Sequence, residues 1–144
     1  MRRNAFARKA LATASLAVSI GVAPFVASAA GLDGSANLVC AANKVVACTK
    51  SAVCLEGDAA SFDLAEFMFV DFKAKVVKAR TLGDERKEES PIRSLTKSNT
   101  QLILQGVENG HGWGMSIEQS GGRMAAAIAG EAVNFMIFGV CTAL

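Results

Sequence analysis

The sequence predicts an all-β domain that follows an N-terminal signal peptide. Three observations support this fold class: short runs of alternating apolar and polar residues, turn residues between the runs, and four cysteines placed after the first thirty residues. Alternation with a period of two is typical of antiparallel strands. The number of runs predicts a meander of about eight strands, and such a meander removes its edges by becoming a small closed or nearly closed barrel, or a β-sandwich as the alternative.

The first thirty residues have the pattern of a secretory signal. Four basic residues within positions 2–9 precede the uncharged stretch Ala10 to Ala30, which contains the small-residue triplet Ala27-Ser28-Ala29. We therefore expect residues 1–29 to be a signal peptide, cut after Ala29 or Ala30, and residues 30–144 to form one domain. The stretch is also long enough for a membrane span. Its Ala- and Ser-rich composition and Pro24 favour cleavage, which leaves no stable membrane anchor.

Removal of the signal changes the charge of the protein. The full chain has fifteen basic and thirteen acidic residues, and four of the basic residues and none of the acidic ones precede Gly31. The mature chain is then slightly acidic, with a net charge of −2 from eleven basic and thirteen acidic residues. A basic footprint for nucleic acid is absent from it, so nucleic acid is not an expected partner.

The four cysteines, Cys40, Cys48, Cys54 and Cys141, would reach an oxidising compartment, where disulfides persist. They allow three pairings, and their spacing favours one of them. Cys48 and Cys54 flank five residues that can turn back as a tight hairpin, which leaves Cys40 to join Cys141. The second bridge would tie the first strand to the last and so fit a closed barrel.

The first half of the chain divides into strands and connectors. We expect a strand region over Leu38–Thr49 with a break at Asn43-Lys44, a connector over Gly57–Leu64 with room for one helical turn, a hairpin of Phe67–Phe72 and Lys75–Arg80, and a charged solvated loop over Gly83–Glu89.

The second half contains five further strand candidates separated by turn residues. They are Ile92–Thr96, Leu102–Val107, His111–Glu118, Arg123–Ala129 and Val133–Cys141. The intervening segments are rich in Asn, Ser and Gly, which tolerate turn conformations. In the last candidate both faces are apolar, as expected for the wall of a closed barrel.

One hairpin can be predicted to the level of register. A short turn around Ser120-Gly121 sets Glu118 opposite Arg123, and strand parity then pairs the large side chains on one face: Trp113 with Ile128, Met115 with Ala126, and Ile117 with Met124. We expect this face to be core. The other face has only small residues and is a possible interaction face: Gly112, Gly114, Ser116, Ala125 and Ala127. Alternate glycines also let a sheet bend, which is the other interpretation.

Three segments resemble a set of small exported bacterial proteins to which no activity is assigned. They are Pro91–Ser94, Leu102–Trp113 and Phe138–Thr142. The resemblance covers most of the mature chain and implies a periplasmic β fold. It implies no catalytic residue and no cofactor.

The residue types needed for catalysis or metal binding do not occur together in the sequence. His111 is the only histidine, and no nucleophile and orienting group accompany it in the pattern of a catalytic site. No zinc-ligand spacing and no Cys-x-x-Cys motif are present. We therefore expect neither a metal nor a cofactor, and a protein that is not an enzyme.

Three classes of function remain. The first is a periplasmic or secreted non-enzymatic module that binds another periplasmic protein. The second is a carrier of a small apolar ligand inside the barrel, which an unfilled cavity beneath Trp113, Met115 or Leu104 would indicate. The third is an enzyme such as a hydrolase, which would need a cleft at His111 with a carboxylate within hydrogen-bond reach.

Overall fold

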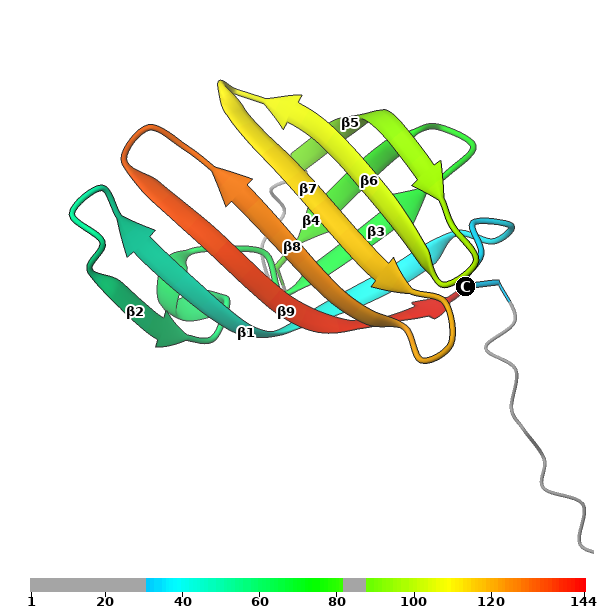
Figure 1. Cartoon of the computed structure of the whole chain (residues 1–144), viewed down its shortest axis with the longest axis horizontal. Helices are drawn as coiled ribbons and strands as arrows, with labels where there is room; N and C mark the ends of the chain where they lie inside the picture. The colour runs from blue at the N-terminus through cyan, green and yellow to red at the C-terminus, as the bar shows by residue number, and fades with distance from the viewer. Residues whose placement is uncertain (1–30, 82–87) are drawn as a thin grey trace, which may run out of the picture.

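A computed structural model describes residues 31–81 and 88–144. Within these residues the chain forms nine strands and one 3-10 turn (Figure 1). In chain order they are β1 (Leu38–Thr49), β2 (Cys54–Gly57), η1 (Ala60–Phe62), β3 (Phe67–Asp71), β4 (Val76–Arg80), β5 (Glu88–Lys97), β6 (Gln101–Glu108), β7 (His111–Glu118), β8 (Arg123–Ala129) and β9 (Val133–Ala143).

Eight of the strands close into an antiparallel barrel, which confirms the predicted fold class. Each strand from β3 to β8 pairs with the next one, and β1 pairs with both β3 and β9. In Figure 1, β7, β8 and β9 cross the front of the barrel, and β3 and β4 lie behind them. The ninth strand, β2, pairs with the second half of β1, beyond the end of the β1–β3 pairing. A small irregularity interrupts β1 between Ala42 and Lys44, where the sequence predicts a break.

Two disulfides join directly opposed residues of neighbouring strands. Cys40 of β1 is bonded to Cys141 of β9, and Cys48 of β1 is bonded to Cys54 of β2. This is the pairing that the spacing favours. The first bridge is buried and closes the barrel, because β1 and β9 are its first and last strands. Both bridges indicate an oxidising location outside the cytoplasm.

One end of the barrel is closed by its own chain. Leu32 is buried in the same cluster as Leu38, Leu102 and Ile117, which fill that end. The segment 31–37 that carries it is held by an ion pair of 3.0 Å from Lys97 to Asp33. Figure 1 places this segment, in cyan, beside the C-terminus at the right-hand end. Burial of Leu32 removes apolar surface from water and gives the closed end a continuous core.

The hairpin of β7 and β8 has the predicted register. The three predicted pairs of large side chains, Trp113–Ile128, Met115–Ala126 and Ile117–Met124, are all present. Just beyond them, Arg123 donates a hydrogen bond of 2.5 Å to Glu118. This bond, together with one from the Ser120 hydroxyl, lowers the pKa of the Glu118 carboxyl to about 2. The large face lies inside the barrel, as predicted.

Two expectations about strand limits are corrected by the structure. Glu88 and Glu89, expected in a solvated loop, form the start of β5 and pair with Ala79 and Lys78 of β4. Pairing with β4 satisfies their backbone groups, and this outweighs the weak strand preference of Glu. The segment after Cys54 extends as β2 before the connector begins. The 3-10 turn lies within the connector over Gly57–Leu64, for which the sequence predicts room for one helical turn.

The expected signal peptide, residues 1–29, and its cut after Ala29 or Ala30 lie outside the described residues, as do residues 82–87 of the expected charged loop. Among the residues described, no helix has the length and apolarity needed to cross a membrane.

Candidate functional site

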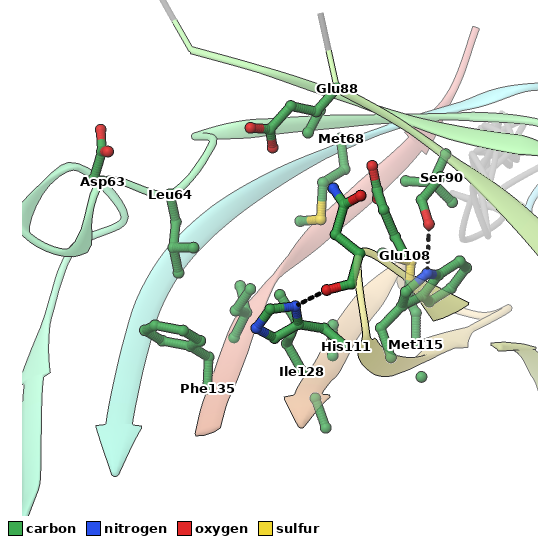
Figure 2. A pocket seen from close by; sticks show the side chains of 18 residues that line it. Asp63, Leu64, Met68, Glu88, Ser90, Glu108, His111, Met115, Ile128 and Phe135 are labelled. Atoms are coloured by element: carbon green, nitrogen blue, oxygen red, sulfur yellow. Dashed lines mark hydrogen bonds between the residues drawn. The ribbon is translucent and has the colours of Figure 1, made fainter. Parts of the chain in front are cut away.

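The end of the barrel opposite Leu32 contains a pocket of about 390 Å³ (Figure 2). Strands β3 to β9 and the segment after η1 all contribute to its lining. The described lining residues are Asp63, Leu64, Met68, Val77, Ala79, Glu88, Ser90, Glu108, Asn109, His111, Trp113, Gly114, Met115, Ala126, Ala127, Ile128, Phe135 and Ile137. Most of them are apolar, and the charged ones lie towards the rim. An eight-stranded barrel has room for one small ligand when its side chains leave part of the interior unfilled.

The pocket exists because inward-facing positions near this end have small side chains. Ala79, Ser90 and Ala126 occupy inward positions on β4, β5 and β8. At the closed end, comparable positions hold large residues such as Leu102 and Ile117, which are fully buried. The inward-facing Trp113, Ile128 and Phe135 of the open half consequently stay only partly buried. Partial exposure of these side chains shows that they are incompletely covered, although the ring of Phe62 contacts that of Phe135 at 6.4 Å between ring centroids.

Trp113 forms one wall of the pocket, and two features fix its ring. Gly106 lies opposite Trp113 in the β6–β7 pairing. A Cβ added to Gly106 would come within 2.4 Å of the ring atom Cζ2, so the indole lies against the bare backbone of β6. The indole Nε1–H donates a hydrogen bond of 2.7 Å to Oγ of Ser90. Trp113 is therefore a fixed aromatic surface whose polar edge already has a partner.

His111 lies at the rim, where the β6–β7 turn ends. Figure 2 shows the His111 ring at the rim, with its Nδ1 3.0 Å from the carbonyl oxygen of Asn109. The ring also packs against Gly130. The turn residues Asn109 and Gly110 both have positive φ, which suits the two-residue hairpin turn that Asn-Gly forms. Among the described residues, His111 makes no hydrogen bond to a carboxylate, and no group of three potential ligands is placed to hold a metal ion.

Two carboxylates flank the opening from different strands. Glu88 begins β5, and Glu108 ends β6 directly opposite His111. Figure 2 shows both side chains around the same opening as Ser90. In the described part of the chain, neither Glu88 nor Glu108 takes part in an ion pair. The pocket therefore combines an apolar interior with hydrogen-bond acceptors at its rim.

The predicted interaction face lies on the outside of the barrel, although two of its members, Gly114 and Ala127, also contribute to the pocket lining. Parity with the buried Met115 and Ile117 directs the small residues of β7 and β8 outward. Large apolar side chains flank them on both sides and are exposed: Ile103 and Val107 on β6, and Met136, Phe138 and Val140 on β9. Met136 and Phe138 are 41% and 42% exposed. A shallow hollow lined by Ser116, Ala125 and Phe138, among others, lies on this face.

No family model, curated protein or solved structure matches this chain.

Sequence reasoning places Trp113 and Met115 beside a possible cavity, and the structure puts both in the pocket lining. Leu104 is instead fully buried in the core. Reasoning from sequence missed Ser90, Gly106 and the two rim glutamates. The signal for Gly106 is present, because the Asn-Gly turn sets the register that places this glycine opposite the tryptophan.

Proposed function

We propose that this protein is an exported, periplasmic, non-enzymatic binding module that takes a small, largely apolar ligand into the pocket at the open end of its barrel. The observation that carries the proposal is the partial exposure of Trp113, Ile128 and Phe135 around an unfilled cavity. Uncovered apolar surface of this kind gains free energy when a ligand removes it from water. The two disulfides support a location in an oxidising compartment.

The size and lining of the pocket favour one small molecule. A volume of about 390 Å³ lies at the lower end of the range for small-molecule sites, about 300 to 1,000 Å³. The lining combines apolar walls with a few polar groups at the edge, as ligand sites commonly do. Since Leu32 closes the other end, a ligand enters and leaves through this opening.

The single tryptophan of the chain provides the assay, because Trp113 lies in the pocket wall. Titration with the uncharged probe N-phenyl-1-naphthylamine is expected to change Trp113 emission and to raise probe emission in a saturable way. Replacing Ala126 or Ala79 by Leu fills pocket space and is expected to weaken binding at least ten-fold. Ala125→Leu, the matched control on the outer side of β8, is expected to bind like the natural protein. Absence of saturable binding, or an unchanged affinity in both pocket variants, would overturn the proposal.

A second candidate function, interaction with another protein, is favoured by the exposed apolar residues on the outer face. Here the partner proposed is a second copy of this chain. The face carries a row of large residues on β9 beside the small residues of β7 and β8, so two copies related by a two-fold axis can each place Phe138 over the other's Ala125 and Ala127. The central part of the face has no charged side chain to oppose this packing.

The dimensions of the face predict weak self-association. Strand spacings of about 4.8 Å and rises of about 3.3 Å per residue give the patch from β6 to β9 roughly 15 Å in each direction. A patch of these dimensions has an area of roughly 200 Å². This area is well below the roughly 800 Å² per partner of a standard interface. Sedimentation equilibrium is expected to show dimers only at high micromolar concentration, and Phe138→Asp is expected to abolish them. A natural protein that stays monomeric at millimolar concentration would exclude this second function.

A further inference from the structure

We infer that the ligand of the barrel-mouth pocket is an amphiphile with a cationic amine head and an apolar body. The inference rests on the proposed function, because it names the chemical class that the same pocket would select. The apolar part is set by the interior walls. The head group is set by Glu88 and Glu108 at the opening, neither of which takes part in an ion pair within the described part of the chain.

The two carboxylates approach the opening from elements that are not paired with each other at this level. Glu88 pairs with Ala79 of β4, whereas Glu108 lies at the far end of β6, beyond the β5–β6 pairing, which ends at Gly106. Their side chains therefore reach the opening from two sides (Figure 2). An ammonium group at the opening would be attracted by both carboxylates, while its hydrocarbon part occupies the space beside Trp113 and Phe135.

No opposing positive charge lines the described part of the pocket. Its described lining contains no Lys and no Arg. Lys78 of β4 pairs with Glu89 on the outer side of the barrel. A carboxylate ligand such as a fatty acid would meet charge of its own sign at the opening.

The polar side chain inside the pocket, Ser90, does not compete with the rim carboxylates for the ammonium head of the ligand. Ser90 is the one buried polar residue among the described residues, and its Oγ accepts the Trp113 indole hydrogen. The deep part of the pocket therefore suits hydrocarbon, because an ammonium group buried there without a carboxylate would be costly. The head of the ligand stays at the rim, and its body points inward.

Three probes of equal chain length separate the head group from the body. Decylamine, decanol and decanoate are titrated at pH 7.5, below their aggregation concentrations, with Trp113 emission and calorimetry as readouts. Decylamine is expected to bind about ten-fold more tightly than decanol, and decanoate more weakly than both. The preference for the amine is expected to shrink at high salt, since ion pairing at an exposed rim is screened.

Two variants assign the preference to the rim. In Glu88→Gln/Glu108→Gln the amine preference is expected to fall to about two-fold or less, with decanol affinity unchanged. The matched control Glu89→Gln, next in sequence but on the outer side, is expected to keep the full preference. Equal binding of decylamine and decanol, tighter binding of decanoate, or a preference that survives in the double variant would overturn the inference and leave apolar binding intact. Failure of all three probes to bind would overturn the proposed pocket function itself.

Discussion

The two disulfides are expected to stabilise the barrel unequally, and the difference follows from where each closes the chain. The bridge between Cys40 and Cys141 spans a sequence separation of 101, and the bridge between Cys48 and Cys54 spans 6. If cross-links act by restricting the unfolded chain, the long loop contributes about 4.7 kcal/mol and the short one about 2.4 kcal/mol at 25 °C. Burial adds to the asymmetry, because Cys40 and Cys141 are 0% and 3% exposed whereas Cys54 lies on the surface.

Double alanine variants measure this difference. Small domains are stable by about 5 to 15 kcal/mol, so Cys40→Ala/Cys141→Ala is expected to lose a large part of the total or to fail to fold. Cys48→Ala/Cys54→Ala is expected to remain folded with about half that loss. Guanidinium unfolding, followed by far-ultraviolet circular dichroism and by Trp113 emission, gives both free energies.

The test is which double variant loses more unfolding free energy. A variant lacking the Cys40–Cys141 bridge that does not fold, beside a folded variant lacking the other bridge, agrees with the expected order. Equal losses, or a larger loss for Cys48→Ala/Cys54→Ala, would refute the argument that closure of the β1–β9 pair dominates.

Three further outcomes are expected. Gly106→Ala adds a methyl group into the Trp113 ring and is expected to cost about 1 to 3 kcal/mol in denaturant unfolding, with a shift in tryptophan emission. Gly110→Ala is expected to cost about 1 kcal/mol because φ is +78° there, whereas Gly112→Ala, with open space and no positive φ, is expected to be close to neutral. The folded Glu118 carboxyl has a pKa of about 2 against an ordinary value of 4.5. Its contribution to stability is therefore present above pH 4.5 and is lost as the pH falls towards 2. Glu118→Gln is expected to flatten the plot of melting temperature against pH in this range.

Sequence reasoning succeeds here where local geometry determines the outcome. The short turn after Glu118 and the two-residue periodicity of strands are sufficient to give the whole β7–β8 register. The spacing of Cys48 and Cys54 similarly limits that pair to a hairpin. Barrel closure follows, because the remaining two cysteines lie in the first and last strands.

Sequence reasoning fails where the outcome depends on several distant strands. Glu88 and Glu89 look like loop residues, since their strand assignment comes from pairing with β4 and not from their own preference. Whether the interior is filled depends on the summed volumes of side chains from eight strands, which no single segment reveals. The outer side chains of β9 illustrate the same limit, because the pattern predicts an apolar outer side and only the structure shows Met136 and Phe138 exposed.

The division of the barrel into a filled half and an open half separates part of the core from the binding site. Leu32, the buried leucines and the Cys40–Cys141 bridge hold the closed end together, and none of them lines the pocket. Changes at the open end, such as those at Ala79 or Glu88, can therefore alter ligand selection while the closed half keeps the barrel folded. This separation makes the pocket variants informative, because a loss of binding in a variant with unchanged unfolding free energy reports on the site itself.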